Sequence, residues 1–313
     1  MSLRNAKPIS QIAIIGVGQV GAAAAYALIL QSVASELLLV DVKMDLRDSQ
    51  ARDLSDVCYS CNSETRVRAA THQEASQSDI VVVTVGSKFS TGETSVQYMY
   101  QKISIIRSVV NTMKPFKSDA ILLLVANPVD LLTSIAQELS GLPRCQVLGS
   151  GTFLDSVRIR GLLAEKTGVA ANSIDLYVVG VHGDSQVVPW SDAIIGGVPI
   201  QKLIPLNTLD YDKLIGECKS RTQKIIHAKG TTPFGIGSVI SNIASSILSD
   251  KRNICPISHF QPEWGCCFSL PVVLGRAGII KTMQMPMNSG ERAALEESVK
   301  ALKGTMEKIH EDH

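Results

Sequence analysis

Three polar residues near the middle of the sequence have the types and spacing of a small reactive site. Asp155 and Arg158 lie three residues apart in "GSGTFLDSVRIRG", so a helix would place both side chains on one face. His182 follows in "VVGVHGDS", in a glycine-flanked turn after a strand-like run. An imidazole can move a proton near neutral pH, and a guanidinium can hold a carboxylate by two parallel hydrogen bonds. Taken singly, however, a histidine is more often structural than catalytic, and an Asp–Arg pair of this spacing is usually a surface ion pair.

A glycine-rich turn close to the start predicts a nucleotide site. "IAIIGVGQVGAAAAYAL" contains G-x-G-x-x-G at Gly16, Gly18 and Gly21, with a strand-like run before it and a helical run after it. Gly16 permits the tight turn, Gly18 lets the backbone approach a pyrophosphate, and Gly21 lets the helix pack closely on the strand. The free N–H groups at the start of the helix would hold the phosphates.

An acidic residue after the next strand-like run predicts which dinucleotide binds. "ELLLVDV" ends in Asp41, which follows the last glycine by 41 − 21 = 20 residues. A carboxylate there accepts hydrogen bonds from the ribose hydroxyls and would repel a 2′-phosphate. We therefore expect NAD rather than NADP. The alternative is a glycine turn of the same fold without a nucleotide, and the agreement of turn, strand, helix and acid argues against it.

The elements that must position these residues indicate an α/β protein. Apolar, β-branched runs alternate with helical patterns through the first half, as in "QIAIIGVG", "ELLLVDV", "DIVVVTVG" and "AILLLVANP". Such strands predict a doubly wound parallel sheet, covered by helices on both faces. We place this Rossmann domain at residues 1–149.

After about residue 150 the pattern changes to that of an α+β substrate domain, which we place at residues 150–313. "LDSVRIRGLLAEKTG" predicts a helix that ends at Gly168, and short strand-like runs follow it that suit a mixed or antiparallel sheet. Helical patterns cover 208–229 and 234–249, and a C-terminal helix is expected to be capped by Ser289.

The composition limits the classes of partner. Of the 313 residues 45% are hydrophobic, the formal net charge is +1, and no long basic run occurs, so neither a nucleic-acid partner nor an anionic membrane surface is implied. No apolar run is long enough to span a bilayer, and "MSLRNAKPISQ" does not resemble a signal peptide, although it could mark a domain cut from a longer protein.

The cysteines suit reduced thiols in the cytoplasm rather than a disulfide framework, because their number is odd and they are scattered. They are Cys58, Cys61, Cys145, Cys218, Cys255, Cys266 and Cys267. Cys58 and Cys61 have the C-x-x-C spacing but lack two further ligands nearby, so no metal site is expected.

These motifs together resemble the L-lactate/malate dehydrogenase family, over nearly the whole chain from "GVGQVG" to "FSLPVVLGRAGI". The order Asp-x-x-Arg and then "HGDS" is highly specific. The details are most similar to lactate-dehydrogenase-like domains fused to a ubiquitin-conjugating-enzyme variant. The resemblance implies hydride transfer between nicotinamide and a small 2-hydroxy or 2-oxo acid, and an assembly that is at least a homodimer.

The resemblance also implies a role for each site residue. His182 would be the acid/base, Asp155 would orient its ring, and Arg158 would hold the substrate carboxylate. Asn127, before a cis Pro128, would contact the nicotinamide ribose and the reacting oxygen. The remaining positions are Thr232 in the substrate pocket, Ile236 on the nicotinamide ring and Lys88 near the pyrophosphate. The other histidines receive no role.

One loop departs from the family pattern G-E-[ST]-R. The stretch reads Gly92-Glu93-Thr94-Ser95, so Ser95 stands where an arginine should polarise the substrate carbonyl. Phe89 stands where lactate enzymes carry glutamine and malate enzymes carry arginine, which suggests a bulky apolar substrate side chain. Lys102 is expected to be too far along the following helix to replace the arginine.

Two functions remain open from the sequence. One is an NAD-dependent 2-hydroxyacid dehydrogenase with weak or altered activity, which the retained Asp155, Arg158 and His182 favour. The other is a non-catalytic NAD(H)-binding module that regulates an attached ubiquitin-related domain, which Ser95 and Phe89 favour.

Overall fold

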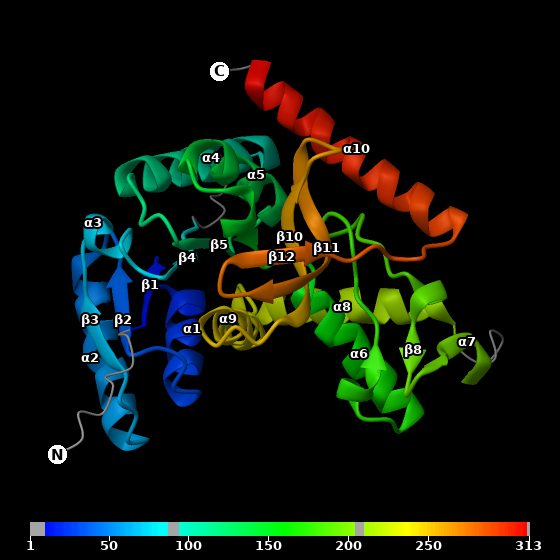
Figure 1. The fold of residues 1–313 in the computed structure, drawn as a ribbon, viewed down its shortest axis with the longest axis horizontal. Helices are drawn as coiled ribbons and strands as arrows, with labels where there is room; N and C mark the ends of the chain where they lie inside the picture. Colours follow the sequence, from blue (N-terminus) through cyan, green and yellow to red (C-terminus); the bar gives the residue numbers. More distant parts are fainter. Residues whose placement is uncertain (1–9, 87–93, 204–209, 312–313) are drawn as a thin grey trace.

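A nine-stranded sheet forms the centre of the protein (Figure 1). The computed structural model describes residues 10–86, 94–203 and 210–311. The strand order is β12-β11-β10-β6-β5-β4-β1-β2-β3, and a second sheet has the order β7-β8-β9.

The first half of the chain alternates strands and helices, as the apolar pattern predicts. Its strands are β1 (Gln11–Ile15), β2 (Glu36–Val40), β3 (Arg66–Ala69), β4 (Ile80–Val83), β5 (Ile121–Leu124) and β6 (Val147–Gly149). Its helices are α1 (Gln19–Leu30), α2 (Met44–Ser60), α3 (His72–Ala75), α4 (Ser95–Met113) and α5 (Val129–Ser140). All neighbouring strands from β3 to β6 pair in parallel, which confirms the doubly wound Rossmann arrangement.

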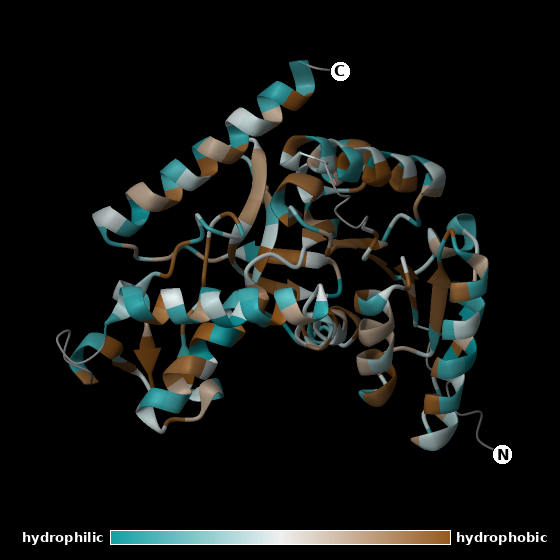
Figure 2. Cartoon of the chain, turned by 180° about the vertical axis from the view of Figure 1, so that it is seen from behind, coloured by the Kyte–Doolittle hydropathy of each residue, from teal (hydrophilic) through white to brown (hydrophobic). Residues whose placement is uncertain are grey.

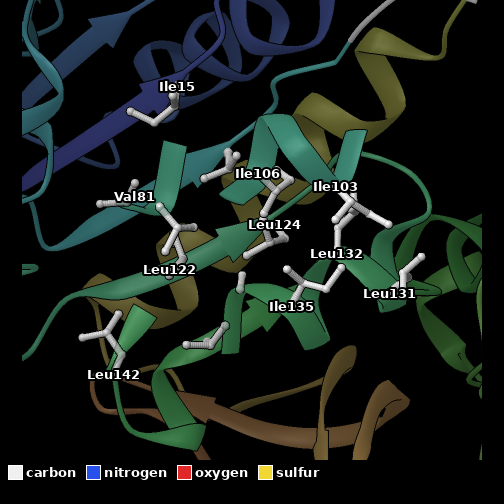
Figure 3. Close-up of a cluster of buried hydrophobic side chains, with 14 of the residues drawn as sticks. Ile15, Val81, Ile103, Ile106, Leu122, Leu124, Leu131, Leu132, Ile135 and Leu142 are labelled. Carbon is white, nitrogen blue, oxygen red and sulfur yellow. The ribbon is translucent and has the colours of Figure 1, made fainter. Parts of the chain in front are cut away.

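The parallel strands β1, β2, β4, β5 and β6 each contribute side chains to two separate cores, because successive residues of a strand point to opposite faces. On one face, residues such as Val81 and Leu122 pack with Ile103 and Ile106 of α4 and with Leu132 of α5 (Figure 3). On the other face, the intervening strand residues pack against α1, α2 and α9 (Pro233–Leu248). The continuous apolar runs in the sequence therefore reflect burial on both faces of the sheet.

The direction of chain progress reverses between β1 and β4. From β1 the chain moves outward to β2 and β3, and then it returns to β4, β5 and β6 on the other side of β1. In open α/β sheets, ligands bind at such a switch point, beyond the carboxyl ends of the strands. The glycine turn follows β1 and Asn127 follows β5, so both lie at this edge.

The second half adds an α+β part, but its main strands extend the first sheet. The antiparallel strands β10 (Asn253–Gln261), β11 (Cys266–Gly275) and β12 (Gly278–Thr282) join it where Ser258 pairs with Gly149 of β6. The mixed sheet that the sequence predicts is thus partly continuous with the parallel one. The division at residues 149 and 150 stays a prediction.

A third core lies under the small second sheet. Its elements are β7 (Ile174–Asp175), β8 (Ile194–Ile195), β9 (Val198–Pro199), α6 (Phe153–Thr167), α7 (Ile200–Leu203) and α8 (Tyr211–Lys229), together with the short 3₁₀ turns Ala171–Ser173 and Trp190–Asp192. A further 3₁₀ turn, Arg144–Gln146, lies outside this core and directly precedes β6. Helix α6 ends at Gly168 in the left-handed conformation, as predicted. Figure 2 shows the strands mostly in brown, whereas the helices mix brown and teal, as expected for amphipathic helices.

The start of the C-terminal helix differs from the prediction. Helix α10 (Ser289–Glu311) begins at Ser289, and the capping contacts come from Asn288. Its side-chain oxygen accepts from the Glu291 N–H at 2.9 Å, and a Glu291 carboxylate oxygen accepts from the Asn288 N–H at 3.0 Å. The prediction of a Ser289 cap was therefore wrong by one residue, because asparagine and serine are both strong capping residues and stand side by side here.

Across residues 10–86, 94–203 and 210–311, no helix combines the length and the apolar character that a bilayer span requires.

A buried carboxylate ties together segments of both halves of the chain, far from the carboxyl ends of the parallel strands. Asp79, directly before β4, accepts from the Gln11 N–H at 2.9 Å, from Lys117 at 2.7 Å and from Arg276, in the turn between β11 and β12, at 2.9 Å. Burial opposes ionisation, but these contacts outweigh it and hold the pKa of Asp79 below its usual value. A carboxylate with a depressed pKa stabilises the folded state above its unfolded pKa and loses this contribution as the pH falls.

We expect Asp79→Asn to lower the free energy of unfolding by about 1–3 kcal/mol at pH 7, because the charged hydrogen bonds are lost. The difference from wild type should shrink as the pH falls below about 4. Urea unfolding at pH 7 and pH 3 measures both effects. Asp119→Asn is the matched control, since Asp119 also contacts Lys117, at 3.3 Å, but is 60% exposed. Equal losses in the two variants would contradict the role of Asp79.

Candidate active site

The glycine turn has the shape that close packing at this edge requires. Gly16 has φ +90°, which disfavours any other residue, and a Cβ there would lie 3.0 Å from the backbone of Val85. A Cβ on Gly21 would lie 2.1 Å from the Gly16 carbonyl oxygen. Both glycines are therefore needed to bring α1 against the strand ends.

Gly18 differs from the other two glycines because no atom of the described residues lies within 4 Å of the position where its Cβ would be. It caps α1 without a side-chain hydrogen bond, and the first turn of α1 carries no acidic residue. The turn thus leaves an open approach to helix N–H groups that lack a side-chain cap, at the positive end of the helix dipole. This arrangement fits the pyrophosphate of a dinucleotide.

Asp41 lies beside this turn and is held by the backbone. One carboxylate oxygen accepts from the Val17 N–H at 2.8 Å, and the other accepts from the Lys43 N–H at 2.9 Å. Each oxygen keeps a further lone pair for a ribose hydroxyl. The structure thus brings together four of the residues predicted to bind the cofactor, which are Gly16, Gly18, Gly21 and Asp41.

The segment that carries His182 is fixed on both sides. Val179 and Val187 form an antiparallel bridge, and Gly180 exchanges two backbone hydrogen bonds with Ser269 of β11, at 2.8 and 3.0 Å. Gly180 and Gly183 have positive φ values of +87° and +120°. The chain therefore bulges out of the sheet between them, with His182 in the bulge.

His182 and Asp155 form a direct pair, and Arg158 adjoins it. The Nδ1 atom of His182 lies 2.7 Å from a carboxylate oxygen of Asp155, and a guanidinium nitrogen of Arg158 lies 3.7 Å from the other. The side chain of Asp155 is 8% exposed, against 25% for His182. The spacing of Asp155 and Arg158 on α6 thus produces the predicted cluster, and Nε2 of His182 remains for an external group.

The pairing shifts the two pKa values in opposite directions, which favours a protonated His182 and an ionised Asp155. Burial disfavours the imidazolium, but Asp155 and Asp130 outweigh it, so the pKa of His182 is raised above its usual value. Burial also disfavours the Asp155 carboxylate, but the hydrogen bond and charge of His182 outweigh it and lower the pKa of Asp155. The charged form of the pair is therefore favoured over a wider pH range than in isolated side chains.

Asp130 is a site residue that the sequence reasoning did not single out. It lies in the first turn of α5, it is 2% exposed, and one of its oxygens accepts from the backbone N–H of His182 at 2.7 Å. Its other carboxylate oxygen is buried and has no hydrogen-bond partner among the residues that the structure describes. Burial raises the pKa of Asp130 to about 6. The available signal was a carboxylate three residues after Asn127, in the apolar run that follows Pro128.

Asn127 is exposed after β5, and its bond to Pro128 is cis. Asn127 precedes Asp130 by three residues, so its turn is tied to the His182 segment. The backbone carbonyl of Asn127 accepts from the ammonium of Lys102 at 2.7 Å. Lys102 therefore reaches this turn from α4, although the sequence suggested only that it was too distant to replace the arginine.

Thr232 and Ile236 lie at the start of α9. Thr232 is the residue before the helix, and Ile236 is half-buried against the core that α1 shares. A Cβ on Gly237 would lie 2.8 Å from the Ala23 carbonyl oxygen, so α9 packs directly on α1. A Cβ on Gly235 would lie 3.1 Å from Leu154, the neighbour of Asp155. The segment thus lies between the glycine-turn helix and the Asp155 helix.

Ser95 is the first residue of α4 and is exposed. Thr94 caps this helix, because its hydroxyl accepts from the Gln97 N–H at 3.2 Å and the Gln97 side chain accepts from the Thr94 N–H at 2.9 Å. The position expected for an arginine is therefore a regular helix start with a short neutral side chain. Lys88 and Phe89 lie outside the described residues.

The C-x-x-C pair ends α2, with Cys58 buried and Cys61 exposed. Within the ranges that the structure describes, no group of three or more histidine, cysteine or acidic side chains could hold a metal ion.

Two family models match consecutive parts of the chain. The model of the lactate/malate dehydrogenase NAD binding domain matches residues 10–149. The model of the lactate/malate dehydrogenase alpha/beta C-terminal domain matches residues 152–313. The first match agrees with the glycine turn and Asp41, and it supports NAD as the cofactor.

Curated relatives and solved structures point the same way. An L-lactate dehydrogenase A from Rhizopus oryzae is 38% identical over 94% of this chain and 91% of its own length, and an L-lactate dehydrogenase from Deinococcus radiodurans is 34% identical over 96% and 99%. The crystal structure of a minor L-lactate dehydrogenase from Enterococcus mundtii superposes with a TM-score of 0.92 at 30% identity, covering 97% of this chain and 99% of that one. Both family models and relatives that match almost end to end lead to one conclusion: the chain belongs to the lactate/malate dehydrogenase family.

Proposed function

We propose that this protein is a weak or altered NAD-dependent oxidoreductase that interconverts a small 2-oxo acid and the corresponding 2-hydroxy acid. The observation that carries the proposal is the 2.7 Å contact between His182 and Asp155, with Arg158 on the same helix. The contact matters because it fixes the orientation of the imidazole ring, which proton transfer to a bound substrate requires.

In this proposal the two ring nitrogens of His182 have different tasks, which the contact supports. Nδ1 carries a proton that it donates to Asp155, so Nε2 exchanges a proton with the substrate oxygen. In the reducing direction the imidazolium protonates the new alkoxide, and in the oxidising direction the neutral ring removes the hydroxyl proton. Asp155 stays ionised and stabilises the imidazolium.

Arg158 would hold the carboxylate of the substrate. Its contact with Asp155 is long, at 3.7 Å, and its side chain keeps 18% exposure. A guanidinium has five N–H donors in one plane, so donors remain for two parallel hydrogen bonds to a second carboxylate. This grip orients the substrate carbonyl, and lysine could not reproduce its planar geometry.

The cofactor supplies hydride chemistry at C4 of its nicotinamide ring when it is bound. Gly16, Gly18 and Gly21 shape the turn for the pyrophosphate, and Asp41 faces the ribose position. Asn127, Thr232, Ile236 and Lys88 complete the proposed contacts, and the substrate side includes Phe89 and Ser95. These assignments rest on the family resemblance and, except for Lys88 and Phe89, on the positions described above.

The weak or altered character of the activity follows from Ser95. A neutral hydroxyl on a short stem cannot offer a positive charge to the oxygen that becomes negative. Loss of one well-placed donor typically costs about 10²–10³ in rate. Oxidation of NADH with a panel of 2-oxo acids, followed at the nicotinamide absorbance band, tests the proposal, with His182→Ala as the inactive control.

Ser95 also favours a second candidate, an inactive NAD(H)-binding module that regulates an attached ubiquitin-related domain. That attachment, a homo-oligomer of at least two subunits and a cytoplasmic location remain proposals from the sequence. The absence of turnover with every 2-oxo acid, combined with tight NADH binding, would favour this candidate over the dehydrogenase.

We expect NADH to bind much more tightly than NADPH, because the Asp41 carboxylate would meet the 2′-phosphate. Fluorescence titration of both cofactors measures the difference, and Asp41→Asn should narrow it. Comparable affinities for wild type would show that Asp41 does not read the ribose, and failure to bind either cofactor would remove the proposed site.

We expect Asp130→Asn to move the pH dependence of 2-oxo acid reduction. Reduction needs the imidazolium, so the rate falls as the pH rises through the pKa of His182. Removing a carboxylate that raises this pKa should move the fall to lower pH. The profile of kcat/KM against pH is the measurement. Asp79→Asn is the matched control, because it also removes a buried carboxylate that accepts from a backbone N–H, but far from His182. An unchanged pH profile for Asp130→Asn would show that Asp130 does not raise the pKa of His182.

We expect Ser95→Arg to raise the turnover of a small 2-oxo acid such as pyruvate by about tenfold or more, below the 10²–10³ of an optimised donor. The guanidinium gains most when the carbonyl oxygen becomes negative, so it favours the transition state over the substrate. The Thr94–Gln97 cap does not use the Ser95 side chain and should survive. His182→Ala in the same background should abolish the gain, and unchanged background activity with intact NADH binding would favour the inactive module.

A further inference from the structure

One face of the C-terminal helix α10 follows the segment that carries His182. Glu291 accepts from the Ser191 N–H at 3.0 Å and also from the Ser191 hydroxyl. Further along the helix, the Ser298 hydroxyl donates to the Ser185 hydroxyl oxygen at 2.9 Å. The separation of 298 − 291 = 7 residues is close to two helical turns, so both side chains lie on one face of α10. The helix therefore holds the segment after His182 at two points.

An apolar contact brings the same face of α10 against the chain just before His182. Leu295 is buried, and a Cβ on Gly180 would lie 3.0 Å from one of its methyl carbons. Gly180 is also the residue that exchanges two backbone hydrogen bonds with Ser269 of β11. Helix α10 thus reaches the backbone on both sides of His182.

Ser298 places a hydroxyl in an otherwise apolar part of α10. It is 3% exposed, and the next residue, Val299, belongs to the core over the sheet. Burial of a hydroxyl costs free energy unless the group is hydrogen-bonded. Thr305 of the same helix donates back to the Ala301 carbonyl at 3.0 Å, whereas Ser298 donates outward to Ser185. The buried hydroxyl is therefore used to hold another segment of the chain.

The turn between His182 and Ser185 does not fix its own geometry. Gly183 has φ +120°, a conformation that glycine adopts freely, and the Asp184 side chain is 100% exposed. Gln186 closes the turn through two long hydrogen bonds. Its side-chain oxygen accepts from the Gly183 N–H at 3.3 Å, and its own N–H donates to the Gly183 carbonyl at 3.4 Å. The position of the turn therefore depends on contacts with other elements.

Two helices supply such contacts beyond His182. Lys219 of α8 donates to the Asp184 carbonyl at 3.0 Å, but its side chain is 36% exposed, so water competes for this hydrogen bond. The contact from α10 starts at the buried Ser298, where water competes less. His182 is thus held at its own N–H by Asp130 of α5, and three residues later by Ser298.

We propose that Ser298 is a positioning residue for His182. By fixing Ser185, it keeps the turn in the conformation that directs the imidazole ring at Asp155, so α10 sets the geometry of the acid/base from outside the site. The inference deepens the proposed function and rests on it, because the pair has a catalytic task only if the protein transfers a proton to a 2-oxo acid. Ser298 acts on the reaction only through Ser185.

Ser298→Ala removes the contact and leaves a side chain that suits a helix. The charged groups that face His182 are Asp155 and Arg158 of α6 and Asp130 of α5, and the variant changes none of them. Because Asp155 raises the pKa of His182, a loosened ring should titrate at lower pH, closer to its ordinary value. NMR titration of the His182 ring protons, assigned by comparison with His182→Ala, measures this pKa without cofactor, substrate or turnover.

Ser185→Ala removes the same contact from its exposed side, so the test stands even if Ser298→Ala does not fold. The two single variants and the double variant should lower the pKa of His182 equally, because they break one interaction. Thr305→Val is the matched control, since it removes a hydroxyl of α10 that bonds within the helix, and it should titrate as wild type does. An unshifted pKa in both single variants, or additive shifts in the double variant, would overturn the inference.

The kinetics of 2-oxo acid reduction separate positioning from a general loss of stability. We expect Ser298→Ala to lower kcat by about three- to tenfold with little change in KM, because Arg158 still holds the substrate. Lower thermal stability with unchanged kcat and an unchanged His182 titration would mean a purely structural role, and the proposed function would remain. If wild type turned over no 2-oxo acid, the proposed function would fail, but a shifted His182 titration in Ser298→Ala would still show that α10 positions the ring.

Discussion

The contact between His182 and Asp155 is the interaction on which the rest of the site depends. Burying a carboxylate without a partner costs free energy, and so does burying an imidazolium. At 2.7 Å the attraction between the two groups offsets the desolvation cost of both. The fold meets this requirement with two independent supports. Helix α6 positions Asp155. The backbone around His182 is fixed by two contacts: Gly180 is hydrogen-bonded to Ser269, and Asp130 accepts from the His182 N–H. The His182–Asp155 pair is therefore fixed by contacts with α5, α6 and β11, although His182 itself lies in a turn.

The cofactor side depends on a different constraint, which is the close approach of helix backbones to neighbouring backbone atoms at glycine positions. Gly21 lies so close to the Gly16 carbonyl that no side chain fits, whereas no atom of the described residues lies within 4 Å of the Cβ position of Gly18. Helix α9 packs on α1 with similar closeness at Gly237, and so it brings Ile236 to the same edge of the sheet. The two halves of the chain thus meet at the carboxyl ends of β1, β4 and β5, where a dinucleotide and a small acid would be joined.

Local patterns predicted the fold and the cofactor turn well, because they depend on residues that are near one another in sequence. The continuous apolar runs gave the buried parallel strands, and Gly168 ended α6 as expected. Contacts between distant segments could not be predicted in the same way. The bonds from Asp130 to His182 and from Lys102 to Asn127 span 52 and 25 residues and depend on how the helices seat on the sheet. The extension of the first sheet by β10 likewise depends on one pairing, between Ser258 and Gly149.

Charge is distributed unevenly over the proposed site. Arg158 is partly balanced by Asp155, and Asp130 adds a second carboxylate against the backbone of His182. Ser95 places only a short neutral side chain at the start of α4. If the proposed reaction takes place here, the substrate oxygen would become negative with less stabilisation than a further guanidinium would provide, so the chemical step would be slow. The residues that shape the glycine turn and hold Asp41 lie on the other side of the site and would be unaffected. A slow dehydrogenase and an inactive NAD(H)-binding module would therefore share the same cofactor side and differ only in the chemical step.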